Sequence, residues 1–97
     1  MAKKYNWIIG IGGTEIDDVE TYIVHGTQHA VKKHLLNLVR DARNEDPNRW
    51  DYGITNINGI DVSSFGDHLY AYAVFSNYHI DYSAQMMPDD KDIKEIR

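Results

Sequence analysis

The sequence predicts an α+β fold in which one amphipathic helix packs on one face of an antiparallel four-stranded sheet, in the order ββαββ. Three observations predict it. Two runs of β-forming residues open the chain, a segment with the apolar spacing of a helix follows, and a strongly alternating segment occupies the second half. A chain of 97 residues is long enough for one domain with one modest core, and we assign that domain to residues 1–83.

The first two strands are expected at residues 5–10 and 19–25. A tryptophan and two isoleucines at residues 7–9 form the apolar centre of the first strand, and a glycine-rich sequence at residues 10–13 follows it. Because glycine adopts positive φ without steric cost, we expect these glycines to form a turn or a bulge. The second strand alternates β-branched residues along one face, so the two strands are predicted to pair as a hairpin with a long loop.

The helix is predicted over residues 28–43. Thr27 precedes it as a suitable N-cap, because its hydroxyl can accept a hydrogen bond from a free amide of the first turn. Apolar residues recur at steps of four, three and four, which places them on one face of the helix: Val31, Leu35, Leu38 and Ala42.

The segment after the helix is expected to begin with an ordered loop at residues 50–53, anchored by its two aromatic side chains. Residues 54–64 allow two interpretations. Asn58 and Gly59 suit a type I′ hairpin turn, but an irregular turn followed by a strand over residues 59–63 fits the pattern equally well.

The last predicted strands lie at residues 69–75 and 78–82, and residues 84–97 are predicted to form an acidic flexible tail. The first of these strands is apolar or aromatic on both faces, with Tyr70 and Tyr72 on its second face. One helix cannot cover both faces of a sheet. We therefore expect either solvent-exposed tyrosines or a homodimer formed through this face or through an edge strand.

Composition excludes several classes of protein. The formal net charge is −5 and the chain contains no cysteine, which excludes disulfides, zinc–cysteine sites and thiol nucleophiles. A reducing, cytoplasmic location is the expected one. No apolar run approaches the roughly 18 residues of a membrane span, and the acidic balance argues against direct binding to a nucleic-acid backbone.

No catalytic motif is complete. The glycines at residues 10–13 lack the spacing of a dinucleotide-binding loop, and the serines lack the context of a nucleophile elbow. The histidines near the helix start do not have the spacing of a zinc pair: His25, His29 and His34. Three carboxylates could converge, but no spacing requires it: Asp51, Asp61 and Asp81. We therefore predict a protein without enzymatic activity, cofactor or metal.

Charge is segregated along the chain. Residues 27–43 carry a net charge of +3, so the remainder carries −8. The helix start is a chemically suitable anion site, because free amides and nearby basic groups favour phosphate. The candidate anion-binding residues are His25, Thr27, His29, Lys32 and Lys33. The alternative interpretation is that these basic side chains only solubilise the outer face of the helix.

The candidate residues for binding a partner combine acidic loops with aromatic anchors. Interface energy concentrates in a few aromatic and arginine side chains, and acidic groups steer a protein toward a basic partner. The candidate partner-binding residues are Glu15, Asp17, Asp18, Glu20, Trp50, Tyr70 and Tyr72.

Four segments of the chain resemble segments of small uncharacterised proteins encoded by phages and mobile elements: Val24-His25-Gly26-Thr27, Trp50-Asp51-Tyr52-Gly53, Leu69-Tyr70-Ala71-Tyr72-Ala73-Val74 and Tyr78-His79-Ile80-Asp81-Tyr82. No activity is attached to these segments. The resemblance implies a context in which small acidic proteins bind and block a host protein, or sequester a signalling molecule.

Our leading hypothesis is a non-enzymatic binding protein that blocks a host defence or regulatory protein by occupying it. The first alternative is an oligomeric sponge for an anionic, nucleotide-type messenger. The second is a virion or assembly protein, which composition does not distinguish from the other two.

Overall fold

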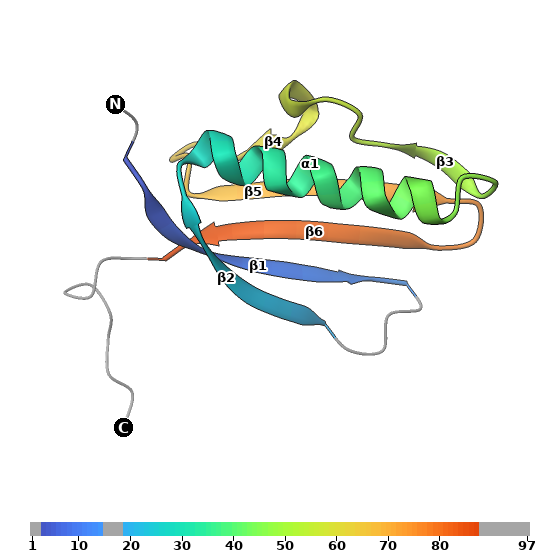
Figure 1. Ribbon diagram of the computed structural model, residues 1–97, viewed down its shortest axis with the longest axis horizontal. Coiled ribbons are helices and arrows are strands. Elements are labelled where there is room, and N and C mark those ends of the chain that lie inside the picture. The colour runs from blue at the N-terminus through green and yellow to red at the C-terminus, as the bar shows by residue number, and fades with distance from the viewer. Residues whose placement is uncertain (1–2, 15–18, 88–97) are drawn as a thin grey trace.

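The computed structural model describes residues 3–14 and 19–87, which form one helix packed on one face of a six-stranded antiparallel sheet (Figure 1). The predicted α+β class, with one helix on an antiparallel sheet, is confirmed. The predicted count of four strands is wrong, and so is the ββαββ order. The elements are β1 (Tyr5–Gly13), β2 (Glu20–Gly26), α1 (Gln28–Glu45), β3 (Trp50–Gly53), the 3₁₀ helix η1 (Ile57–Gly59), β4 (Asp61–Val62), β5 (His68–Phe75) and β6 (His79–Met86).

The strand order is β2-β1-β6-β5-β3, and the short β4 also pairs with β5. The expected β1–β2 hairpin is present, and β5 and β6 form a second hairpin. The two hairpins become one sheet because β1 pairs with β6, the last strand in the chain. The predicted domain boundary at residue 83 falls inside β6, and Ala84 is fully buried. Residues 88–97 of the predicted tail lie outside the described residues.

The glycines of β1 continue the strand, so the expected turn over residues 10–13 is wrong. Gly10 pairs with Ser83 and Gly12 with Asp81. Among the glycines of β1, only Gly13 has a positive φ, of 143°, and a Cβ atom added there would lie 2.2 Å from the carbonyl oxygen of His79. A side chain is therefore excluded at Gly13 by the close approach of β6.

The connection between α1 and β5 contains two short strands. Residues 50–53 form β3 and pair with β5, so the expectation of a loop is wrong there. Of the two interpretations of residues 54–64, the irregular turn followed by a strand is confirmed, because η1 precedes β4. Asn56 caps η1 by accepting a hydrogen bond from the Gly59 amide at 3.1 Å.

The core lies between α1 and the sheet. The predicted helical stripe is buried or half-buried, and the Thr27 hydroxyl caps the helix by accepting a hydrogen bond from the Ala30 amide. Alternate residues of β5 are buried beneath the helix: Leu69, Ala71, Ala73 and Phe75. The largest buried side chain, Trp7, donates its indole N–H to the Gly26 carbonyl at 3.2 Å, so its burial leaves no polar group unpaired.

The Gly13→Ala variant is expected to lose about 2 kcal/mol or more of unfolding free energy, because the new methyl group collides with backbone that cannot move freely. The matched control is Gly12→Ala, where the added Cβ lies at an ordinary 3.7 Å from Val19 Cγ2. We expect that variant to stay within about 1 kcal/mol of wild type. Urea unfolding of both proteins measures the difference, and equal midpoints would contradict the assignment.

The pH dependence of stability tests the environment of Tyr82. Burial, with help from Glu45 and Asp41, raises the pKa of Tyr82 from 10.0 to about 12. The unfolded chain therefore releases this proton first, so its stabilising contribution is complete below pH 10 and is lost as the pH rises toward 12. We expect wild type to lose about 1 kcal/mol between pH 8 and pH 11 through this residue.

The control is Tyr82→Phe, which removes the titrating hydroxyl and its long hydrogen bond of 3.4 Å to the Leu38 carbonyl. At pH 7 its stability should lie within about 1 kcal/mol of wild type, because that bond is weak. Its alkaline loss should be smaller than that of wild type when both are unfolded by urea at pH 8 and pH 11. An identical alkaline slope in the two proteins would show that Tyr82 is not the responsible group.

Candidate interaction site on the open face of the sheet

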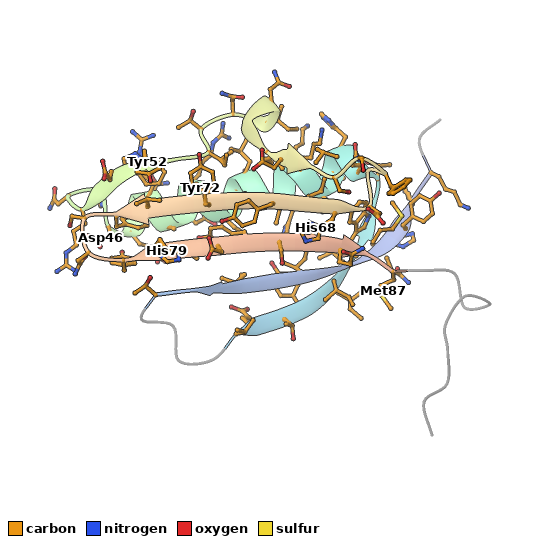
Figure 2. The ribbon with its side chains drawn as sticks, turned by 180° about the vertical axis from the view of Figure 1, so that it is seen from behind. Asp46, Tyr52, His68, Tyr72, His79 and Met87 are labelled. Carbon is orange, nitrogen blue, oxygen red and sulfur yellow. The ribbon has the colours of Figure 1, made fainter. Side chains whose placement is uncertain are left out.

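The face of the sheet opposite α1 is not covered by any described element, and we call it the open face (Figure 2). The register places on it the side chains that alternate with the buried ones along each strand. Its members include two exposed isoleucines at one end and a cluster of tyrosines at the other. They are Asn6, Ile8, Gly10 and Gly12 of β1, Thr21, Ile23 and His25 of β2, Tyr52 of β3, Asp61 of β4, His68, Tyr70, Tyr72 and Val74 of β5, and His79, Asp81, Ser83 and Gln85 of β6.

A β-bulge brings Tyr52 to this face. Trp50 pairs with Phe75 but Tyr52 pairs with Val74, so β3 has one extra residue between these two pairs. This extra residue places the side chains of Trp50 and Tyr52 on opposite faces of the sheet. Trp50 consequently packs on the helix side, with its ring perpendicular to that of Phe75 and beneath the guanidinium of Arg43. In a regular strand the two aromatics would share one face. The bulge therefore divides them between the core and the open face.

Tyr52, Tyr70 and Tyr72 form an open depression together with three residues of β5 and β6. The ring centroids of Tyr52 and Tyr72 lie 6.1 Å apart at an interplanar angle of 74°, which makes a corner of two aromatic walls. Tyr70 continues the wall, with its ring 6.1 Å from that of Tyr72 and tilted by 30°. Figure 2 shows Tyr52 and Tyr72 side by side above His79. The depression has a volume of about 570 Å³, and the remaining lining residues are Val74, His79 and Asp81.

The carboxylate of Asp81 is held at the floor of this depression by two neighbours. Tyr70 donates its hydroxyl proton to Oδ1 at 2.5 Å, and His79 Nε2 lies 3.2 Å from Oδ2. The hydrogen bond to Asp81, followed by burial, raises the pKa of Tyr70 to about 12, so Tyr70 remains a donor at neutral pH. Two contacts leave part of the acceptor capacity of the carboxylate unused, and 40% of the side chain is exposed.

Thr14, His79 and Asp81 follow one another in the hydroxyl–imidazole–carboxylate order of a hydrolytic triad. The Thr14 hydroxyl lies 2.7 Å from His79 Nδ1. A hydrolase also needs free amides directed at the oxygen of the reacting carbonyl. The amide of Thr14 is already donated to the carbonyl of His79 at 3.1 Å. We therefore assign a structural role to this series of side-chain contacts, because it connects the end of β1 to the start of β6.

The charges of the two layers differ in sign. Across the strands that the structure describes, no position holds a lysine or an arginine, whereas four positions are acidic: Glu20, Asp51, Asp61 and Asp81. Two of these, Asp61 and Asp81, lie on the open face beside the tyrosines and raise the pKa of Tyr70 through their charge. The helix layer holds four basic side chains: Lys32, Lys33, Arg40 and Arg43. An approaching cation is therefore attracted to the open face and repelled by the helix.

The predicted anion site is divided by the fold. His25 lies on the open face, where Nδ1 is 2.8 Å from the Asn6 side-chain oxygen, and the Thr27 hydroxyl is used as the helix cap. Lys32 does not line a groove with His29 and Lys33. Those two residues do come together in a groove of about 470 Å³ between α1 and η1, lined also by Leu36, Asn37, Arg40, Asn56 and Ile57. Arg40, about two helical turns beyond Lys33, was not among the predicted residues.

The predicted partner site is also only partly assembled. Tyr70 and Tyr72 lie on the open face as expected, but Trp50 faces the helix and Glu20 is exposed at the edge strand β2. The remaining members lie outside the described residues: Glu15, Asp17 and Asp18. Tyr52 and Asp81 belong to the site although neither was predicted. Alternation along β6 was a signal for Asp81, but no sequence signal revealed the bulge that turns Tyr52 outward.

Comparisons of the chain with models of known protein families, with curated proteins and with solved structures gave no match. In the part of the chain that the structure describes, no helix is long and apolar enough to cross a membrane. Residues 3–14 and 19–87 also contain no group of three or more histidine or acidic side chains placed to hold a metal ion.

Proposed function

We propose that this chain is a non-enzymatic binding protein that uses the open face of its sheet to recognise a basic surface on a protein partner. The observation that carries the proposal is the chemistry of this face. It combines half-buried and exposed tyrosines with two carboxylates, and the strands beneath it contain no lysine or arginine. Tyrosines supply contact area at low entropic cost, and acidic groups select a partner of opposite charge.

The shape of the face supports a macromolecular partner rather than a small substrate. The tyrosine-lined depression is open to solvent, and a second shallow depression of about 410 Å³ lies around Ile8 and Ile23 at the other end. These two isoleucines have 40% and 60% of their surface exposed. An aromatic and acidic depression at one end of the layer and an apolar patch at the other, both open to solvent, have the pattern of an interface rather than of a closed active site. Nucleic acid is a poor partner for this face, because Asp61 and Asp81 would repel phosphate.

The resemblance to phage-type proteins supports a proposal for the kind of protein that is bound. We propose that it is a host defence or regulatory protein in the cytoplasm, blocked by stoichiometric occupation of its basic surface. A second copy of the chain is the other possible occupant of the open face. Such a symmetric pair would place the carboxylates of two copies near one another, which disfavours it unless the axis separates them.

The test is native mass spectrometry of the protein purified from the cells in which it occurs, at 50 and 500 mM ammonium acetate. We expect a stoichiometric complex that is retained by wild type at low salt and weakened at high salt. The variant Tyr52→Ser, Tyr72→Ser should lose at least tenfold in affinity. A matched double substitution on the opposite layer, Lys33→Ser, Arg40→Ser, should keep the complex.

Three results would contradict the proposal. A complex lost by the helix variant but kept by the tyrosine variant would move the interface to the helix layer. A monomer without partner under all conditions would leave the open face without an occupant. A homodimer that dissociates in the tyrosine variant would identify the occupant as a second copy and overturn the assignment to a basic partner.

The groove between α1 and η1 supports a second candidate function, the binding of an anionic small molecule. His29, Lys33 and Arg40 line it together with the side-chain amides of Asn37 and Asn56. Basic groups and amides that converge on a hollow of about 470 Å³ suit a phosphate-bearing ligand.

Thermal unfolding in the presence of a panel of cyclic and ADP-ribose-type nucleotides tests this candidate. A true ligand at a hundredfold excess over its Kd stabilises the fold by about 2.7 kcal/mol. The stabilisation should disappear in Lys33→Ser, Arg40→Ser and persist in Tyr52→Ser, Tyr72→Ser. No stabilisation by any nucleotide would remove this function, whereas stabilisation that survives the helix substitutions would place the ligand elsewhere.

A further inference from the structure

We propose that the depression formed by Tyr52, Tyr70, Tyr72 and Asp81 receives an arginine side chain of the partner. The inference rests on the proposed function, because it names the group of a basic partner that this site recognises. It is carried by three features of the described residues: the arrangement of the rings, the state of the carboxylate and the distribution of charge.

The rings are placed to hold a cation against their faces. Tyr52 and Tyr72 meet at 74° with centroids 6.1 Å apart, and Tyr70 extends the surface beyond Tyr72. A cation within about 6 Å of a ring centroid is attracted by the negative face of the ring. Two walls at nearly a right angle allow one group to contact the face of one tyrosine while it lies against the other. A flat tyrosine patch would not provide this corner.

Asp81 supplies the charge that an aromatic corner alone lacks. Its carboxylate is partly exposed on the floor of the depression, and Tyr70 and His79 orient it through the opposite oxygens. Each oxygen retains acceptor capacity, so a further donor can bind without breaking the contacts already present. Asp61 lies opposite Tyr70 in the sheet and adds a second negative charge nearby.

Among residues 3–14 and 19–87, no lysine or arginine lines this corner. Two contacts between a basic group and an aromatic ring lie elsewhere, with Arg43 5.2 Å from the Trp50 ring centroid and Lys3 5.0 Å from that of Tyr5. Arg43 on Trp50 demonstrates the interaction within the same fold, on the helix side. In the described part of the chain, the tyrosine corner has the aromatic and acidic groups of such a contact and a histidine, His79, but no lysine or arginine.

Arginine fits this site better than lysine does. The guanidinium is planar, so it can stack on one tyrosine and still direct N–H groups at the carboxylate in the plane of the stack. It is also less strongly hydrated than an ammonium group, which favours an open site where the aromatic contact must compete with water. A lysine would gain the attraction of Asp81 but little from the flat rings.

The experiment is an NMR titration of the full-length, isotope-labelled protein with three blocked pentapeptides of the form Gly-X-Gly-X-Gly. In these X is arginine, lysine or citrulline, the neutral isostere of arginine. We expect the arginine peptide to shift the resonances of Tyr52, Tyr72 and Asp81, with an affinity at least tenfold above that of the citrulline peptide and at least threefold above that of the lysine peptide.

Substitutions of Asp81 and Tyr52 locate the binding group. Asp81→Asn keeps an acceptor for Tyr70 but removes the charge, and should weaken the arginine peptide at least fivefold. The matched control is Asp41→Asn, which removes the same charge from the exposed surface of α1 and should change the affinity less than twofold.

Tyr52→Ser should also weaken binding, and Tyr52→Phe should restore it, because phenylalanine keeps the aromatic wall. Unfolding midpoints within about 3 °C of wild type would show that each variant is folded.

The outcomes separate this inference from the proposed function. Equal binding of arginine and citrulline peptides, or equal losses in Asp81→Asn and Asp41→Asn, would overturn the arginine site. If the natural partner were still lost in the tyrosine double variant, the proposed function would survive that result. Conversely, the peptides could show a selective arginine site while the natural complex is unaffected by substitutions on the open face. That result would overturn the proposed function but not the arginine site.

Discussion

The pairing of β1 with β6 is the interaction on which the rest of this structure depends. It joins an N-terminal hairpin to a C-terminal one across seven registered residue pairs, from Trp7–Met86 to Gly13–Ile80. Without it, β1 and β6 would each present an unpaired edge, and the N-terminal hairpin would be an isolated two-stranded unit, which is at best marginally stable. The pairing is also demanding sterically, because β6 passes so close to Gly13 that no side chain is tolerated there.

The same pairing creates the surface that we consider functional. With β6 between β1 and β5, a layer several strands wide faces a single helix, and only one side of that layer is covered (Figure 1). On the covered side, small residues such as Ala71, Ala73 and Ala84 allow the helix to approach the sheet closely. On the other side, the alternating positions of β5 and β6 carry tyrosines and a carboxylate that have no helix to pack against. The burial of one face thus leaves a chemically distinct second face free for recognition.

The helix layer and the sheet layer differ in the charge of their side chains. Lysine and arginine occur on α1 and in the flanking segments, whereas the described strands contain neither and hold four acidic residues. Under the two proposed functions, the open face would therefore receive a basic partner and the groove beside α1 an anion, so the two candidate sites would select ligands of opposite sign.

The local pattern of residues by itself determined the helix, its Thr27 cap, the first hairpin and the placement of Tyr70 and Tyr72 on the second face of their strand, because periodicity and capping depend only on neighbours in the chain. Tertiary structure alone decided the extension of β1 through its glycines, the position of β6 in the middle of the sheet and the outward turn of Tyr52. Each of these depends on a partner strand distant in sequence. A side chain is excluded at Gly13 because His79 lies against it, and the bulge after Trp50 exists only relative to the register of β5. The tyrosine corner with Asp81 is therefore a product of strand pairing, which no single segment encodes.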